Sequence, residues 1–431
     1  MSDMPRTKNE FSTIPLQVTD IKPEWAKVLI NQLRLKNLEP PLTQQSKVTS
    51  FHLEDCKKSN GDMSTTCRMA VEVMDTPGKR QNYYFIAKLL PPDDPNRLYC
   101  FEANVFEKEI SIYFDLLPML RQTFEGLPSL ERFFSRTIPS CVYGSNNMDG
   151  AGVLVFECAL QQGFLHPADP KGLSLEQLHT VITNMAKFHA IGSTRVSKSH
   201  KQLKLRHPYL LSNVYNSPTM DEGTKNVFET YIHFLKSFPG EEKLVEQFQK
   251  HCAGEDGAKL MYSCMRRQVD SPFNTVVHGE LWEKNMLFRQ GDEESYDCVI
   301  LDWKNAKIAS ATKDLAFLLL SSTTNELRTE SLDEILQHYY STFCETLKLL
   351  DEELWAIVTY DEFLADYKLS TLGAFMQAVC VLVQEMHFYE HQLTQERENL
   401  QEIADTLRVY ETRALNMMHD VTLKERWFSE E

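Results

Sequence analysis

The hydrophobic pattern of this chain changes its period near residue 160, and that change constrains the fold more than any other feature. From about 48 to 157, apolar residues gather in short strand-like runs such as 83–90 and 151–157, with one helical segment at 101–117. Beyond 160 they recur at helical spacing, starting after a capping box of Ser174 and Gln177. The pattern predicts an α+β fold with a β-rich N-terminal lobe and a larger helical C-terminal lobe.

These boundaries divide the chain into three expected regions. Residues 1–45 form an N-terminal tail and an amphipathic helix, with Trp25 and Leu29 on its apolar face. Residues 46–160 form the β-rich N-lobe, and residues 161–431 form the helical C-lobe with the catalytic and metal-binding loops. We expect the hinge between the two lobes near 157–165.

Composition narrows the class of protein. The formal net charge of −16 argues against a nucleic-acid partner or an anionic membrane surface, because both require a positive field. No apolar run approaches the roughly 20 residues that span a bilayer, and residues 1–11 lack the apolar core of a signal peptide. The 10 cysteines form no CxxC pair. We therefore expect a cytoplasmic protein with reduced thiols, no membrane partner and no nucleic acid.

The densest chemical pattern lies at 276–285, followed by the apolar strand that ends in Asp302. It contains an acid, Glu280, then Asn285 five residues later, and then the second acid, Asp302. In metal-assisted phosphoryl transfer, the first acid accepts the proton of the attacking hydroxyl, while the amide oxygen and the second carboxylate hold Mg²⁺. The alternative interpretation of the same residues is a polar loop between two strands, with Asp302 capping a turn.

Lys88 is the one cation inside the apolar run 83–90. A buried ammonium requires an anionic partner, so Lys88 either pairs with a carboxylate or phosphate or lies on an exposed edge. Glu109 in the following helix is the expected partner, and Glu102 is its rival. Such a pair is similar to the strand lysine and helix glutamate that position nucleotide phosphates.

A small polar turn, Asn60 to Thr66, precedes the second strand-like run. Its backbone N–H groups, around Gly61 and Ser64, are suited to covering phosphates. The turn lacks the G-x-G-x-x-G pattern, and an ordinary hairpin turn remains the alternative.

Taken in order, these segments resemble the choline-kinase-like and ecdysteroid-kinase-like small-molecule kinases, relatives of the aminoglycoside phosphotransferases. The similarity runs from about 45 to 390, and the block from His278 to Asp314 is its most specific part. The matching segments are 61–65, Ala87-Lys88, 109–113, 155–157, 178–190, 278–285, 301–304 and 313–315.

The resemblance implies a two-lobed protein-kinase-like fold that binds ATP between its lobes. It also implies a hydroxylated small-molecule substrate, such as an ecdysteroid, another steroid-like alcohol or a choline-like compound. By the same resemblance Glu157 contacts adenine at the hinge, Asn285 and Asp302 bind Mg²⁺, and Asp314 supports the catalytic loop.

Two departures from the family pattern bear on activity. The family usually has His-Gly-Asp where this chain has His278-Gly279-Glu280. The extra methylene of the glutamate extends its carboxylate by about an ångström. In a catalytic site, a misplacement of that size lowers the reaction rate roughly 10²-fold. Lys304 stands where relatives often carry Gln, and it either supports phosphate charge or points to solvent. An active enzyme and a catalytically impaired pseudokinase that binds a nucleotide or a small hydrophobic ligand therefore both remain open.

Three other segments carry weaker signals. His387 to His391 matches the H-x-x-E-H pattern of a zinc-protease group, although its surroundings are typical of ordinary helix packing. His189 is expected to be a hydrogen-bonded core residue. The charged stretch 395–413 fits the solvated face of a terminal helix or a partner-binding coil.

Overall fold

The computed structural model describes residues 14–33, 46–54, 64–76, 79–91, 94–147, 152–211, 218–252, 254–266, 271–291, 295–351, 353, 358–396 and 399–420. The chain divides into two compact units. Unit 1 consists of Met1–Ile110 and Pro139–Gln162, and unit 2 of Ser111–Ile138 and Gly163–Glu431. The expected N-lobe, 46–160, includes the helical insertion 111–138 that clusters with unit 2.

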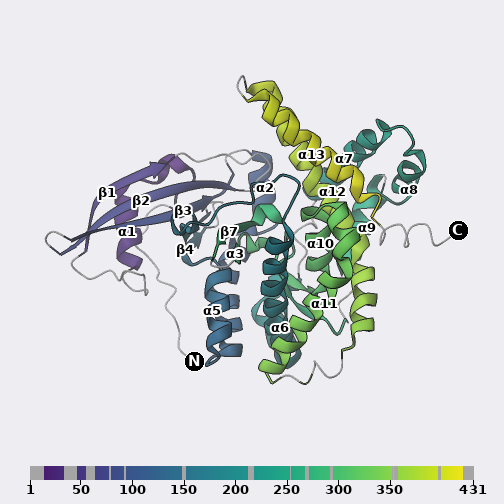
Figure 1. Ribbon diagram of the computed structural model, residues 1–431. Helices are drawn as coiled ribbons and strands as arrows, with labels where there is room; N and C mark the ends of the chain where they lie inside the picture. Colours follow the sequence, from purple (N-terminus) through teal and green to yellow (C-terminus); the bar gives the residue numbers. More distant parts are fainter. Residues whose placement is uncertain are drawn as a thin grey trace. The chain divides into compact units, whose positions relative to one another are not determined.

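Unit 1 is built on one antiparallel sheet of five strands in the order β1-β2-β3-β5-β4. One face of β3 packs into the core, because Tyr83, Phe85, Ala87 and Leu89 alternate inward. The expected amphipathic helix is confirmed as α1, whose Trp25 and Leu29 join this core, and Figure 1 shows it against the sheet. The strands are β1 (Lys47–Glu54), β2 (Thr65–Thr76), β3 (Lys79–Leu89), β4 (Cys141–Asn146) and β5 (Gly152–Glu157), and α1 is Pro23–Leu33.

The helical segment expected at 101–117 is broken into shorter pieces. Helix α2 (Asp94–Glu102) ends before Asn104, which has a φ of 49° in the left-handed region. Helix α3 (Val105–Ser111) follows and continues as a π-helical turn, Ile112–Leu116. The left-handed residue accounts for the break, because an α-helix cannot continue through that backbone conformation.

Unit 2 consists mainly of helices, with two short antiparallel ribbons that carry the loops of interest. The ribbons pair β6 (Asn274–Val277) with β9 (Lys307–Ser310), and β7 (Met286–Gln290) with β8 (Tyr296–Ile300). The helices are α4 (Leu117–Arg121), α5 (Pro128–Thr137), α6 (Leu175–Arg206), α7 (Pro218–Lys236), α8 (Glu242–Cys252), α9 (Gly254–Arg266), α10 (Thr312–Ser322), α11 (Asn325–Leu349), α12 (Tyr360–Gln395) and α13 (Leu400–Met417).

Local sequence explains how these helices begin and pack. The predicted capping box is present at α6, where the Ser174 hydroxyl accepts from the backbone N–H of Gln177. Helix α11 buries the face that contains Ile335, Tyr339 and Phe343. With its antiparallel sheet and its larger helical part, the molecule has the predicted α+β fold.

Helix α12 corrects the expectation that no segment is apolar enough to cross a membrane. Its length and composition meet that test, because an 18-residue window contains few charged residues. However, 72% of that window is buried inside the protein, where α12 packs against α10 and α13. The same pattern is typical of the core helix of a folded domain.

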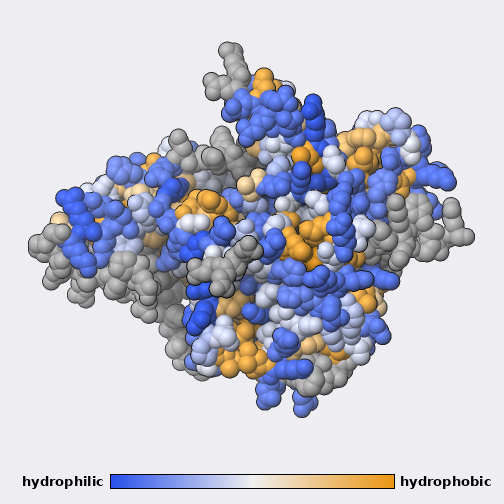
Figure 2. All heavy atoms as spheres, in the orientation of Figure 1, coloured by the Kyte–Doolittle hydropathy of each residue, from blue (hydrophilic) through white to orange (hydrophobic). Residues whose placement is uncertain are grey.

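Hydrophilic residues cover most of the face that Figure 2 shows, with smaller apolar areas between them.

Candidate active site

The loop from His278 to Asn285, between β6 and β7, is held at its first residues by a carboxylate from the start of α10. Asp314 accepts hydrogen bonds from the backbone N–H of His278 at 2.6 Å and of Gly279 at 2.8 Å. Gly279 has a φ of 83°, and a Cβ there would lie 2.3 Å from the carbonyl oxygen of Asn305. Only glycine fits this position without strain. Asp314 thus supports the loop in the way that the resemblance implied.

His278 links this loop to the strand that ends at Asp302. Its Nε2 lies 2.8 Å from the carbonyl oxygen of Leu301, and its Nδ1 lies 3.2 Å from the backbone nitrogen of Glu280. Because a carbonyl only accepts, Nε2 donates and Nδ1 accepts, which assigns the neutral tautomer. Burial lowers the pKa of His278, with partial opposition from Asp314, so the ring stays neutral.

Glu280 is held at one of its two carboxylate oxygens. Oε2 accepts a hydrogen bond from Asn305 Nδ2 at 2.7 Å and lies 3.2 Å from Lys304 Nζ. No described residue donates a hydrogen bond to Oε1. The side chain of Glu280 is 18% exposed, so Oε1 remains within reach of a ligand.

Lys304, whose role the sequence left open, does not point to solvent. It is 9% exposed, and its ammonium contacts the carboxylates of both Glu280 and Asp302. Asp302 itself has a φ of 63°, a left-handed backbone conformation that is uncommon outside glycine. The expected base and the expected metal ligand are therefore neighbours, joined by one cation.

Asn285 is fixed next to them and presents an oxygen that suits a metal ion. Its Nδ2 donates to the carbonyl oxygen of Glu280 at 2.9 Å, and its own carbonyl oxygen accepts from Leu301 N at 2.8 Å. Its amide Oδ1 accepts no hydrogen bond from a described residue. An amide oxygen and a carboxylate are the hard ligands that Mg²⁺ prefers, and phosphates and water usually complete its shell. The residues present therefore fit the implied metal.

Unit 1 contains the residues that were predicted to bind the nucleotide. Lys88 Nζ lies 2.7 Å from Glu109 Oε2, and the side chains are 9% and 1% exposed, so the predicted pair is formed and buried. The rival partner, Glu102, is exposed in α2. Ser64 precedes β2, close to where Thr66 pairs with Lys88, and Glu157 pairs with Phe85 at the end of β5. Gly61 lies outside the described residues.

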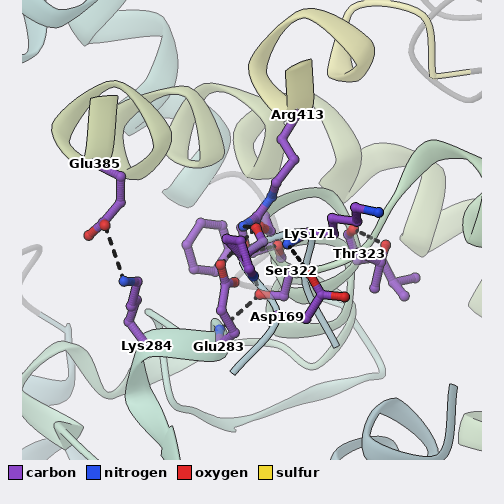
Figure 3. A network of polar contacts seen from close by, with 12 residues as sticks. Asp169, Lys171, Glu283, Lys284, Ser322, Thr323, Glu385 and Arg413 are labelled. Atoms are coloured by element: carbon purple, nitrogen blue, oxygen red, sulfur yellow. Dashed lines mark hydrogen bonds and ion pairs between the residues drawn. The ribbon is translucent and has the colours of Figure 1, made fainter. Parts of the chain in front are cut away.

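Helix α13 supplies a second contact that holds the loop, and the sequence did not predict it. Arg413 Nη2 lies 2.7 Å from Glu283 Oε1, and both side chains are buried. Figure 3 shows Arg413 reaching toward Glu283 and Ser322, with Glu385 of α12 facing Lys284. Because 130 residues separate Arg413 from Glu283, no local pattern could have identified the pair.

The two histidine signals behave differently in the structure. His189 is fully buried and bonded to Tyr339 OH at 2.6 Å and to Asp314 at 3.2 Å, so it is the predicted core residue and also supports the loop carboxylate. His387 and His391 are exposed on α12. Among the described residues, no three His, Cys, Asp or Glu side chains form a cluster that could hold a metal ion.

Comparison with known proteins identifies the family. Residues 59–352 of this chain match the model of the ecdysteroid kinase-like family. The chain belongs to the ecdysteroid kinase-like family. The match includes the site residues of both units, from Gly61 to Asp302, and thus confirms the resemblance that the sequence motifs indicated. No curated protein matches the chain.

Several solved structures are similar at low identity. An aminopropanol kinase associated with a microcompartment is 13% identical, with a TM-score of 0.39, over 94% of this chain and 98% of its own. A Plasmodium vivax ethanolamine kinase is 12% identical, with a TM-score of 0.40, over 86% and 83%. The GDP complex of an aminoglycoside 2′-phosphotransferase is 11% identical, with a TM-score of 0.37, over 90% and 99%.

Proposed function

We propose that this member of the ecdysteroid kinase-like family is an enzyme that transfers the γ-phosphoryl group of ATP to a hydroxyl group of a small molecule. An ecdysteroid or another steroid-like alcohol is the proposed acceptor, and the cytoplasm is the proposed location. The main support for this proposal is the carboxylate of Glu280, of which the described residues bind only one oxygen. Its Oε2 is anchored by Asn305 and Lys304, while its Oε1 remains able to accept the proton of an incoming hydroxyl.

The other residues supply binding and positioning. Mg²⁺, when bound, would neutralise phosphate charge and orient the transferred group, and Asn285 and Asp302 would hold it. Lys88, fixed by Glu109, would bind nucleotide phosphates, and the turn at Gly61 and Ser64 would cover them. Glu157 would contact the adenine ring. Asp314 holds the backbone of the loop in place during the proton transfer.

One observation favours a second candidate, the catalytically impaired pseudokinase. The ammonium of Lys304 contacts both Glu280 and Asp302, so a cation already neutralises the carboxylates that proton transfer and metal binding require. A protein arranged in this way could bind a nucleotide or a small hydrophobic ligand without turnover.

The deciding experiment incubates the protein with Mg-ATP and a panel of ecdysteroid, sterol and amino-alcohol acceptors, and follows phosphate transfer by mass spectrometry. We expect transfer to at least one alcohol, its loss in Asp302→Asn, and no change in Glu390→Gln, an exposed acid on α12. Glu280→Gln should lose about 10²-fold or more in kcat. Full activity of Glu280→Gln would remove Glu280 as the base, and saturable ATP binding without any product would favour the pseudokinase.

A further inference from the structure

A small cavity inside unit 2 lies beside the catalytic loop, on the side of Gly279. Its volume is about 20 Å³. Gly279 forms part of its wall, together with Lys307 of β9, Lys313 and Asp314 of α10, and Gln377 of α12. None of the residues proposed to bind the nucleotide or Mg²⁺ lines this space. The cavity is therefore lined by a different set of residues from the proposed nucleotide and metal sites.

Lys307 is the first unusual feature of this cavity. Its pairing with Val277 in the β6–β9 ribbon fixes its position, and only 9% of the residue is exposed. Within the part of the chain that the structure describes, its ammonium has no hydrogen bond and no ion pair. Burial lowers the pKa of Lys307 to about 8. A buried cation without a partner is costly, and proteins retain such costs mainly at functional sites.

Lys313 places a second ammonium at the same cavity. Its Nζ donates to the carbonyl oxygen of Cys264 at 2.9 Å. Burial, with a smaller contribution from the charge of Lys307, lowers the pKa of Lys313 to about 7. Asp314 is the one carboxylate in the wall, and both its oxygens already accept backbone hydrogen bonds from the loop. The wall thus contains two lysines and one carboxylate that is already engaged, while the charges of Glu280 and Asp366 act on the lysines from outside the wall.

Charge and size together define what the cavity accepts. A single water needs about 10–15 Å³ of such space, so 20 Å³ admits one small group, such as a halide ion or a carboxylate, but not the body of a larger ligand. We propose that this cavity is an anion-binding subsite in which Lys307 and Lys313 hold one small anionic group. That group is either a free inorganic anion or an acidic group at the end of a larger ligand.

The cavity is mechanically connected to the active-site loop. Gln377, in its wall, donates to the carbonyl oxygen of Gly279 at 2.7 Å, and Asp314 binds the N–H of the same glycine. A bound anion would thus lie next to the residues that hold the loop. The subsite requires neither a nucleotide nor turnover, so its test is independent of the proposed kinase activity.

The test measures thermal unfolding and calorimetric binding of the full chain with sodium chloride, sodium acetate and inorganic phosphate as separate probes. At least one probe should raise the unfolding temperature of the parent protein. Lys307→Met should unfold at a higher temperature than the parent without any probe, because it removes a buried unpaired charge. It should also lose the shift caused by the probe and bind the probe about tenfold or more weakly, as expected for one lost charge-assisted hydrogen bond.

Three further variants serve as controls for this test. Lys307→Arg should keep the probe-dependent shift, and Lys313→Met should reduce it even if Lys307→Met fails to fold. Lys243→Gln, an exposed lysine on α8, should respond to salt as the parent does. A response to chloride supports a free anion, and a response to acetate or phosphate alone supports an acidic group on a larger ligand. No response to any probe, or an undiminished response in Lys307→Met, would overturn the proposal.

Discussion

The ion pair between Arg413 and Glu283 offers the sharpest test of how the catalytic loop is held. Arg413 Nη2 lies 2.7 Å from Glu283 Oε1, and the two side chains are 6% and 5% exposed. Arg413 Nη1 also donates to the carbonyl oxygen of Pro170 at 2.7 Å, and Nη2 contacts the carbonyl oxygen of Ser321. Arg413→Met removes all these bonds while keeping much of the buried side-chain volume.

The expected loss follows from what the substitution leaves behind. Glu283 would remain buried with its backbone N–H still bonded to Ser322 Oγ at 2.9 Å, but its carboxylate would have no cation. Breaking a buried pair in this way costs about 3–5 kcal/mol of unfolding free energy. Adding Glu283→Gln to Arg413→Met removes the stranded charge. The double variant should therefore be more stable than the sum of the two single losses predicts, with a coupling of about 1–3 kcal/mol.

Urea denaturation followed by circular dichroism measures these differences. The matched control is Arg408→Met on the same helix, whose pair with Asp405 is exposed at 70% and 56%, so its loss should stay below about 1 kcal/mol. If Arg413→Met costs no more than Arg408→Met, or if the two single losses add without coupling, Arg413 does not brace the loop electrostatically.

Three other perturbations test the remaining parts of the site. Lys88→Met should lower the free energy of unfolding by about 3–5 kcal/mol and weaken ATP binding in calorimetry, because it removes the cation that Glu109 contacts at 2.7 Å. The variant Glu102→Gln, at the exposed rival position, should change stability by less than about 0.5 kcal/mol, and equal losses in the two variants would refute the pairing. Lys304→Met should tighten Mn²⁺ binding about tenfold in electron paramagnetic resonance, because it removes a cation from Asp302, and weaker binding would show that Lys304 does not oppose the metal. Stability should fall as the pH drops from 7.5 to 5, since burial lowers the pKa of His278 below 6.5 and the unfolded chain then binds the extra proton; a urea midpoint that rises toward acid pH would contradict this sign.

Much of the fold could be predicted from the sequence because it is encoded in local periodicity. The apolar run 83–90 indicated a strand, and the structure forms β3 there and buries Phe85 and Ala87 on one of its faces. The capping box at Ser174 was found from residues only three apart. The break at Asn104 was missed, since left-handed backbone conformations leave little trace in hydrophobic spacing.

In the candidate site, too, the residues that local sequence encodes could be predicted, and those that tertiary packing brings together could not. Glu280, Asn285 and Asp302 were predictable because one short loop and one strand end bring them together, and Lys88 was predictable because a cation inside an apolar strand needs a partner. Lys307 and Arg413 were not predictable. In the sequence each is one charged residue among many, and only tertiary packing shows that it is buried.

The structure gives the glutamate at position 280 a physical meaning that the family comparison alone does not. A glutamate has one more rotatable bond than the usual aspartate, so its carboxylate loses more freedom when it is fixed in place. Asn305 Nδ2 and Lys304 Nζ both hold Oε2, at 2.7 Å and 3.2 Å, and thereby restrict that freedom. Lys304, the second departure from the family pattern, is thus one of the two groups that fix the first departure. Glu280 and Lys304 are in direct contact, so the activity of a Glu280 variant should be judged together with that of the matching Lys304 variant.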